Sequence, residues 1–251
     1  YVRKKVSKLK SIEHLFKKVA GLNSRCEQLI STENGLLVGS SSGLYLIKEH
    51  EVKLLSNIRN VGYISEKNSA GMHYILCDEG VFSLTFNEDE YIISPLPLSL
   101  EDPLFSIIGI DSTLWLSGYD MVYKVQKEGP DSTLSKTYAF QSVFPEELRL
   151  DIIDDILYLF SESTIHYYAA EADSFMVYKS NKEVLHSYSN LTFFPPSANQ
   201  HWLKLDQRMV RFDGDASEFQ EEKWGLFENI STFYSHSGSE YWIIDDYSKI
   251  F

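Results

Sequence analysis

The stretch from Leu36 to Ile47, LLVGSSSGLYLI, reads as two β-rich segments separated by small polar residues. Five further stretches of the 251-residue chain have the same form: a strand, a short polar turn and a second strand. They are His73–Leu84 (HYILCDEGVFSL), Leu114–Val125 (LWLSGYDMVYKV), Leu157–Tyr168 (LYLFSESTIHYY), His201–Phe212 (HWLKLDQRMVRF) and Tyr241–Phe251 (YWIIDDYSKIF). The chain is therefore built on an internal repeat.

Each of the six stretches has a bulky residue at an equivalent early position, aromatic in five of the six. These residues are Leu37, Tyr74, Trp115, Tyr158, Trp202 and Trp242, spaced 37, 41, 43, 44 and 40 residues apart. Six residues later each unit starts its next strand, at Gly43, Gly80, Met121, Thr164, Arg208 and Ser248. A period near 40 residues with four short strands per unit is typical of β-propeller blades.

The remaining two strands of each unit flank the central pair. We expect inner strands at Cys26–Thr32, Val61–Glu66, Phe105–Ile110, Leu148–Ile153, Leu191–Phe194 and Ile230–Ser235. Outer strands are expected at positions such as Glu51–Leu55, Tyr91–Ser94, Ser135–Phe140 and Phe175–Lys179. The predicted fold is an all-β propeller of six four-stranded blades, with seven blades if the native chain continues past Phe251.

We expect one propeller domain spanning residues 1–251. Residues 1–14 form a basic N-terminal arm, and residues 15–20 add a closing outer strand to the last blade, because ring closure removes an exposed sheet edge. The predicted blades occupy approximately residues 23–58, 59–98, 104–141, 146–182, 189–224 and 228–251.

Charge separates the arm from the rest of the chain. Residues 1–18 carry a local charge of +6, within a total of −13, so the other residues form an acidic body. An acidic body argues against nucleic acid as a partner, because phosphate binding needs a basic surface. No apolar run reaches the length of a membrane span. The chain begins at Tyr1, without Met or a secretory signal, which favours a piece of a longer protein.

The cysteines Cys26 and Cys77 are too few for a disulfide framework. We expect both to be small buried residues. Their number fits either a reducing compartment or a secreted protein, so it leaves the cellular location open.

The first repeat and its lead-in, FKKVAGLNSRCEQLISTENGLLVGSSSGLYLI (Phe16–Ile47), resemble the repeat of the two-component-regulator propeller family. The matching positions are Gly21-Leu22, Gly35, Gly39-Ser40 and Gly43-Leu44. The tryptophan slot of that repeat is filled by Leu37 in this unit and by Trp115, Trp202 and Trp242 in later ones. The Gly-Leu pair is retained as Gly80-Val81 in the second unit and is then lost.

This resemblance implies the sensor propeller of a bacterial signalling receptor, on the periplasmic or extracellular side of the inner membrane, with a cytoplasmic location as the alternative. It implies no catalytic residues and no cofactor in this chain. Its partners would be a small-molecule, glycan or peptide ligand and an output signalling domain in the same native chain. Dimerisation is left open.

The turns between the second and third strands share one end of the predicted blades with the segments that lead into the inner strands. Five of these six turns carry acidic residues, and two also carry tyrosine. The candidate ligand-binding residues on this loop face are Asp78, Glu79, Tyr119, Asp120, Glu162, Asp206, Asp245, Asp246 and Tyr247. A ring of carboxylates would attract a cation or basic peptide, and the tyrosines would suit sugar rings. The alternative is that these acids are ordinary turn residues.

Metal and catalytic motifs are weak. The seven histidines His14, His50, His73, His166, His186, His201 and His236 lack the spacing of a metal site, and we expect packed or surface roles. Asp151, Asp154 and Asp155 form an acidic group that a calcium site could use, although a turn explains it equally. Two alternatives to the sensor therefore remain: a protein-interaction scaffold and a metal-dependent lactonase- or hydrolase-like propeller.

Overall fold

The computed structural model describes most of the chain after residue 18. The described residues are 19–49, 51–87, 90–98, 100, 102–128, 131–140, 145–153, 155–161, 164–178, 191–197, 200–205, 208–212, 220–222, 230–235 and 241–245. They fall in two compact units, which divide between Leu150 and Asp151. Each unit is described by itself.

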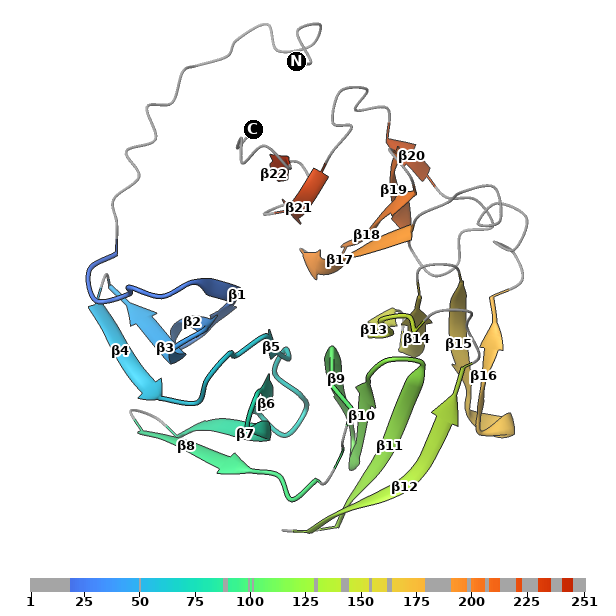
Figure 1. The fold of residues 1–251 in the computed structure, drawn as a ribbon, viewed down its shortest axis with the longest axis horizontal. Helices are drawn as coiled ribbons and strands as arrows, with labels where there is room; N and C mark the ends of the chain where they lie inside the picture. Colours follow the sequence, from blue (N-terminus) through green and yellow to red (C-terminus); the bar gives the residue numbers. More distant parts are fainter. Residues whose placement is uncertain are drawn as a thin grey trace, which may run out of the picture. The chain divides into compact units, whose positions relative to one another are not determined.

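The unit that ends at Leu150 contains three four-stranded antiparallel sheets, each with its strands in chain order (Figure 1). The first sheet comprises β1 (Cys26–Thr32), β2 (Gly35–Ser40), β3 (Gly43–Lys48) and β4 (Glu51–Ser56). The second comprises β5 (Tyr63–Ile64), β6 (Met72–Cys77), β7 (Gly80–Asn87) and β8 (Glu90–Pro95). The third comprises β9 (Ser106–Ile110), β10 (Thr113–Ser117), β11 (Met121–Glu128) and β12 (Asp131–Ala139).

The division between the units falls inside β13 (Arg149–Ile153). This strand forms a fourth sheet with β14 (Ile156–Phe160), β15 (Ile165–Ala169) and β16 (Ser174–Val177), and the short 3₁₀ helix η1 (Ala170–Ala172) connects the last two. A fifth sheet contains β17 (Leu191–Ser197), β18 (Gln200–Leu205), β19 (Arg208–Phe212) and β20 (Gln220–Glu222). The sixth has two described strands, β21 (Ile230–Ser235) and β22 (Tyr241–Asp245).

Four-stranded meanders that follow one another along the chain are propeller blades. The all-β propeller fold predicted from the repeat is confirmed at this level. The described residues hold five complete blade sheets and part of a sixth, so the total of six blades stays a prediction.

The bulky repeat position is a core position in every blade where its side chain is described. Leu37, Tyr74, Trp115, Tyr158 and Trp202 are all at most 3% exposed. They lie on the second strands, which have sheet partners on both sides and therefore bury their residues most fully. Burying one large apolar side chain contributes roughly 1.5–3 kcal/mol.

Sheets pack face to face within each unit. One cluster joins Leu37 and Leu44 of the first sheet to Ile75 and Leu84 of the second. Another joins Tyr74 of the second sheet to Ile107, Leu114 and Leu116 of the third. In the other unit, Tyr158 and Phe160 pack with Leu203 and Val210 of the next sheet. This stacking agrees with the nearly continuous burial along the second strands, such as Leu37 to Ser40 and Leu114 to Ser117.

The backbone approaches a neighbouring sheet closely at two glycines. A Cβ atom on Gly39 would lie 2.8 Å from the Val61 carbonyl oxygen, and one on Gly109 would lie 2.7 Å from Cε2 of Tyr74. Both distances are shorter than a Cβ contact allows. Gly39, part of the motif that carries the family resemblance, is therefore needed for the contact between the first two sheets.

Several strand ends differ from the sequence prediction by a few residues, such as β12, which begins at Asp131 rather than Ser135, and β17, which ends at Ser197 rather than Phe194. Two other details differ as well. The second inner strand was expected at Val61–Glu66, but β5 is only Tyr63–Ile64. The residues on either side of β5 make only single backbone bonds to β6, such as the bond from Ser65 N–H to the Tyr74 carbonyl at 2.8 Å. Cys26 was expected to be buried but is exposed, because β1 is an inner strand whose alternate residues face away from the packed sheet. Cys77 is half-buried, and both thiols are free.

The predicted closing strand lies almost entirely outside the described residues. Only Val19 and Ala20 of residues 15–20 are described, and neither is in a strand. The basic arm of residues 1–14 and the end of the sixth hairpin, residues 246–251, are outside the described residues as well.

Candidate functional site

The loop face of the unit ending at Leu150 consists of three turns and the segments that lead into inner strands. The turns are Ser41–Ser42, Asp78–Glu79 and Gly118–Asp120, and the lead-in segments are residues 57–62, 102–105 and 145–148. Four predicted site residues lie here with described side chains: Asp78, Glu79, Tyr119 and Asp120.

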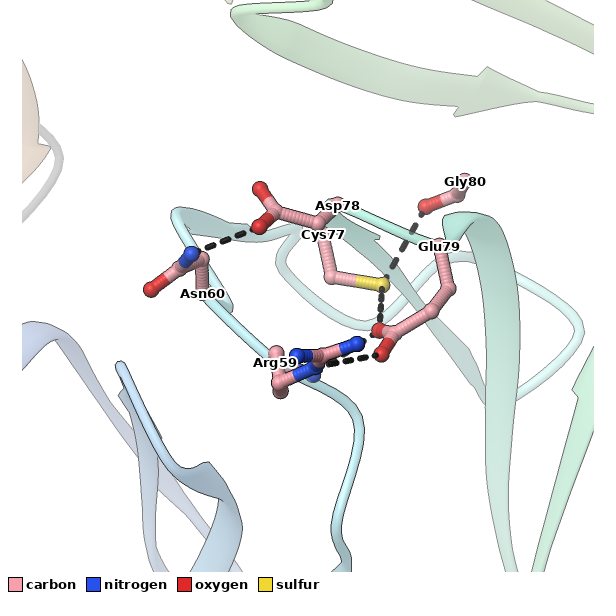
Figure 2. A network of polar contacts seen from close by, with 6 residues as sticks. All are labelled: Arg59, Asn60, Cys77, Asp78, Glu79 and Gly80. Atoms are coloured by element: carbon pink, nitrogen blue, oxygen red, sulfur yellow. Dashed lines mark hydrogen bonds and ion pairs between the residues drawn. The ribbon is translucent and has the colours of Figure 1, made fainter.

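Asp78 and Glu79 hold the lead-in segment of their own sheet (Figure 2). The Asn60 side-chain amide donates to Asp78 Oδ2 at 2.6 Å, and the backbone N–H of Arg59 donates to Glu79 Oε2 at 2.8 Å. The Arg59 guanidinium also lies 3.6 Å from Glu79 Oε1, and the Asp78 N–H donates to the Arg59 carbonyl at 3.2 Å. The two acidic side chains therefore bind the turn between β6 and β7 to the lead-in segment, residues 57–62.

The lead-in segment also connects the first two sheets. The N–H groups of Asn60 and Val61 donate to the carbonyls of Ser41 and Ser40, at 3.3 and 3.0 Å. Asn60 has a positive φ of 52°, a conformation that asparagine adopts more readily than most residues. The Asp78–Asn60 contact is thus part of a chain of bonds that runs from one sheet to the next.

Cys77 lies beneath this network. Its thiol is 3.5 Å from Glu79 Oε2 and 3.5 Å from the Gly80 carbonyl oxygen, so it can donate to either (Figure 2). Burial raises the pKa of the Cys77 thiol to about 11. A thiol with so high a pKa is a poor nucleophile at neutral pH, which gives it a packing role rather than a catalytic one.

Asp120 performs a similar structural role in the third sheet. Its Oδ1 accepts the Glu146 N–H at 3.1 Å, and its own N–H donates to the Glu146 carbonyl at 3.1 Å. Its φ of 52° places it in the left-handed region, where aspartate is tolerated in turns. The turn is thereby held to the segment that leads into β13.

Tyr119 is the most accessible aromatic residue of this loop face among the described residues. Its side chain is 40% exposed, and its ring packs edge-on against Phe105 with centroids 4.7 Å apart. An exposed ring fixed in this way offers an apolar surface, and the backbone of Tyr119 pairs with that of Glu147 in an isolated β-bridge.

The other predicted site residues cannot be placed in the same way. Asp245 ends β22, and its side chain is outside the described residues. The remaining four, Glu162, Asp206, Asp246 and Tyr247, are outside them entirely. The residues with described side chains, Asp78 with Glu79 and Tyr119 with Asp120, are neighbours in the sequence, and the complete ring of carboxylates stays a prediction.

A row of small polar residues at the ends of the second strands was not recognised in the sequence. Ser40 and Ser117 are fully buried and Ser161 is 7% exposed. Ser40 Oγ donates to the Gly43 carbonyl at 2.9 Å, and Ser117 Oγ donates to the Leu148 carbonyl at 2.6 Å. Part of the signal was present in the sequence, because serine or cysteine stands three residues after the bulky position in three of the first four repeats, at Ser40, Cys77 and Ser161, whereas the third repeat has Gly118 there and its serine, Ser117, one position earlier.

The histidines with described side chains are packed. His73 is 3% exposed, and burial lowers the pKa of both His73 and His166 below the ordinary value of 6.5. For His201 only the backbone is described, while His14, His50, His186 and His236 lie outside the described residues.

No group of three metal-ligating side chains occurs among the residues that the structure describes. Asp151 and Asp155 are both described, but Asp154, the third member of the predicted acidic group, is not. Asp155 has a φ of 62° in the turn before β14, as a turn residue would. No helix in the described part of the chain has the length and hydrophobicity of a membrane span.

Comparisons with known proteins support the fold. No protein-family model matches the chain, and no curated protein matches it. Among solved structures it is similar to the extracellular domain of BT4673 from B. thetaiotaomicron, a candidate one-component or hybrid two-component system. The TM-score is 0.64 at 14% identity, over 89% of this chain and 31% of that one.

Two further similar structures are a candidate receptor domain and an enzyme. The extracellular domain of BT3049, a candidate hybrid two-component system from B. thetaiotaomicron, has a TM-score of 0.60 at 11% identity, over 91% of this chain and 32% of that one. Virginiamycin B lyase from Staphylococcus aureus has a TM-score of 0.61 at 11% identity, over 92% of this chain and 84% of that one. The chain spans about a third of the length of the two extracellular domains.

Proposed function

We propose that this chain is a non-catalytic, ligand-sensing propeller domain of a bacterial two-component-type receptor. It recognises a small-molecule, glycan or peptide ligand on the loop face and passes the signal to a separate output domain. The proposed location is the periplasmic or extracellular face of the membrane. In this proposal residues 1–251 act as one domain.

The similarity to receptor extracellular domains is the observation that carries the proposal. It extends over nearly the whole chain, and it agrees with the repeat motif around Gly39-Ser40 and Gly43-Leu44. Because propellers also host enzymes such as the lyase, the absence of catalysis is part of the proposal.

The loop face has features that suit recognition. Asp78, Glu79 and Asp120 are held in place by hydrogen bonds, so their carboxylates need little reordering when a ligand arrives. Tyr119 adds a fixed aromatic surface. Since the acids also fasten the turns, a test has to separate loss of charge from loss of structure.

The test is a charge-neutralised variant that retains hydrogen-bond acceptors. A panel of oligosaccharides, peptides and small metabolites is first screened against the 251-residue chain by the shift in its thermal unfolding midpoint. The triple variant Asp120→Asn, Asp206→Asn, Asp245→Asn is then titrated with the best compound. We expect affinity for a cationic or hydroxyl-rich ligand to fall about tenfold or more, because hydrogen bonds to charged groups are worth roughly 1.5–3 kcal/mol each.

Asp111→Asn is the matched control. Asp111 also adopts a left-handed turn conformation, with a φ of 51°, but it lies between β9 and β10, at the other end of the strands. Full affinity in the triple variant would contradict recognition at the loop face. Turnover of a compound from the panel would contradict the non-catalytic assignment.

An interaction scaffold is the second candidate function, and one observation favours it. The outer strands carry large exposed apolar side chains: Leu54 is 49%, Ile92 is 54% and Leu134 is 46% exposed. Exposed apolar side chains mark protein-binding surfaces where they form one patch, and in this second proposal one such side chain from each outer strand contributes to the surface that a partner covers. Retention of a partner by the chain, and its loss in Leu54→Ser, Ile92→Ser, Leu134→Ser, would favour this function over the sensor.

A further inference from the structure

A hollow of about 330 Å³ opens at the end of the strands opposite the loop face, between the first and second sheets. It lies where the turn between β1 and β2 meets the connection from β5 to β6. A second hollow of about 320 Å³ adjoins it and shares Asn34 and Phe86. The larger volume matches a small organic molecule rather than a single water or ion.

His73 supplies a buried hydrogen-bond acceptor in this hollow. The residue lines the hollow and is only 3% exposed. Its Nδ1 is 2.9 Å from the Ser65 carbonyl, which can only accept, so Nδ1 carries the proton. Burial keeps the pKa of the ring low, and the neutral ring therefore has a lone pair on Nε2. Among the described residues, Nε2 has no hydrogen-bond partner. It is also not fully buried, so part of its surface is open.

The charged groups around the hollow leave one carboxylate uncompensated. Lys67 donates to Glu33 in an ion pair that joins the first sheet to the second. Glu66 also lines the hollow, is exposed, and has no ion-pair partner among the described residues. The side chains that line the hollow therefore carry a net charge of −1. The hydrogen-bond acceptors of His73 and Glu66 have no donor among the described residues.

Phe86 provides an apolar wall. It is half-buried, lines both hollows, and meets His73 in a T-shaped contact with ring centroids 6.5 Å apart. Ile30 adds aliphatic surface. An aromatic face beside a carboxylate favours a cation, because the ring quadrupole attracts positive charge.

We propose that this hollow binds a small organic cation that carries a primary ammonium group on a compact apolar body. The ammonium group, which has three donors and no acceptor, bonds to Nε2 of His73 and to the Glu66 carboxylate. The apolar body packs against Phe86 and Ile30. This site is separate from the proposed loop-face site and would exist whether or not that proposal holds.

Three probes of one shape test the chemistry. The ¹⁵N-labelled 251-residue chain is titrated with benzylammonium chloride, benzyl alcohol and sodium benzoate at neutral pH, and backbone and imidazole resonances are followed by NMR. We expect benzylammonium to shift the resonances of His73, Glu66 and Phe86 saturably, with a dissociation constant at least about tenfold below that of the alcohol. Benzoate is expected not to bind.

Two variants and a control locate the contacts. Glu66→Gln removes the exposed charge without touching the core, and we expect it to weaken benzylammonium binding about threefold. His73→Phe keeps an aromatic ring but removes Nε2, with an expected loss of about tenfold. Glu171→Gln neutralises an exposed carboxylate of η1, outside the hollow and outside the loop-face candidates, and should leave binding unchanged.

The outcomes are decisive. Equal binding of benzylammonium and benzyl alcohol would overturn the ammonium assignment. Unchanged dissociation constants for benzylammonium in both the Glu66→Gln variant and the His73→Phe variant would overturn it as well. No saturable shift up to the solubility limit would overturn the site itself. Because the readout is confined to residues 30–34, 66–73 and 86, these failures are distinct from any result at the loop face.

Discussion

At the scale of single residues, Gln28 shows how one side chain takes the place of a missing strand partner. Its amide nitrogen donates to the Ile64 carbonyl at 3.0 Å, and the Ile64 N–H donates to its amide oxygen at 2.5 Å. These two hydrogen bonds resemble the pair of backbone bonds that joins neighbouring strands of a sheet. They run from the side chain of a β1 residue to the backbone of the short strand β5. Gln28 therefore ties the first sheet to the second.

Replacing Gln28 with leucine should lower the free energy of unfolding by about 2 kcal/mol, because both backbone groups of Ile64 lose their partner. Chemical denaturation measures the change. Gln126→Leu is the control: Gln126 donates to the Ser112 hydroxyl at 2.7 Å and accepts from the Thr113 hydroxyl at 3.3 Å, so its loss leaves no backbone group without a partner and should cost much less. Equal losses in the two variants would contradict the assignment of a special role to Gln28.

The two cysteines should differ in reactivity. Cys26 is exposed, while burial raises the pKa of Cys77 to about 11, so the thiolate of Cys77 is scarce near neutral pH. Mild treatment with iodoacetamide at about pH 8 should alkylate Cys26 first, with Cys77 modified at least about tenfold more slowly. Peptide mass spectrometry follows both sites. Faster modification of Cys77 would show that the loop network opens readily.

At the scale of strands and sheets, Gly109 tests the face-to-face packing. A methyl group there would meet the ring of Tyr74, which is 1% exposed and has little room to move. We expect Gly109→Ala to destabilise the protein by about 1–3 kcal/mol, as overpacking does. Gly62→Ala is the matched control, because the nearest atom to its added Cβ would be 3.9 Å away. A neutral Gly109→Ala would imply that the second and third sheets shift apart easily.

The strand pattern was predictable because its signals are local. The two β-rich segments of Leu36–Ile47, their polar turn and the repetition of this form near every 40 residues locate the hairpins, and β2, β3 and four later hairpins lie where they were expected. The short β5 was not predictable, because its length depends on which residues pair with β6, and only Tyr63 and Ile64 do so. The exposure of Cys26 likewise depends on which face of β1 meets another sheet.

The site was predictable only in part. The acids Asp78, Glu79 and Asp120 were located in turns from their spacing, but their hydrogen bonds to Asn60, Arg59 and Glu146 connect separate segments of the chain. Neither alternation nor repeat length indicates such contacts. For the same reason, the hollow at His73 has no sequence signature.

At the scale of the whole molecule, buried histidines couple stability to pH. Burial is the largest cause that lowers the pKa of His73 and His166 from 6.5, one in each unit. As the pH falls through 6.5, the unfolded chain takes up protons on these residues before the folded protein does. The free energy of unfolding should therefore be greatest above pH 6.5 and should decrease as the pH falls towards the folded-state pKa values.

Urea unfolding between about pH 7.5 and pH 5.5 measures this decrease. The double variant His73→Gln, His166→Gln lacks both titrating groups, and its unfolding free energy should change less over the same range, whatever its absolute stability. An equally steep dependence in the variant would assign the effect to other groups.

The tie from Gln28 to Ile64 and the approach of Gly39 to Val61 also bear on how this repeat can be re-engineered. In each case a residue of one sheet is matched to the backbone at the beginning of the next. A cassette cut at the sheet boundaries would separate these matched pairs, so blades transplanted or duplicated in that way would lose them. A segment that ends after Ile64 would contain both residues of each pair. This position is therefore a better junction for building chimeric propellers than the boundary between the two sheets.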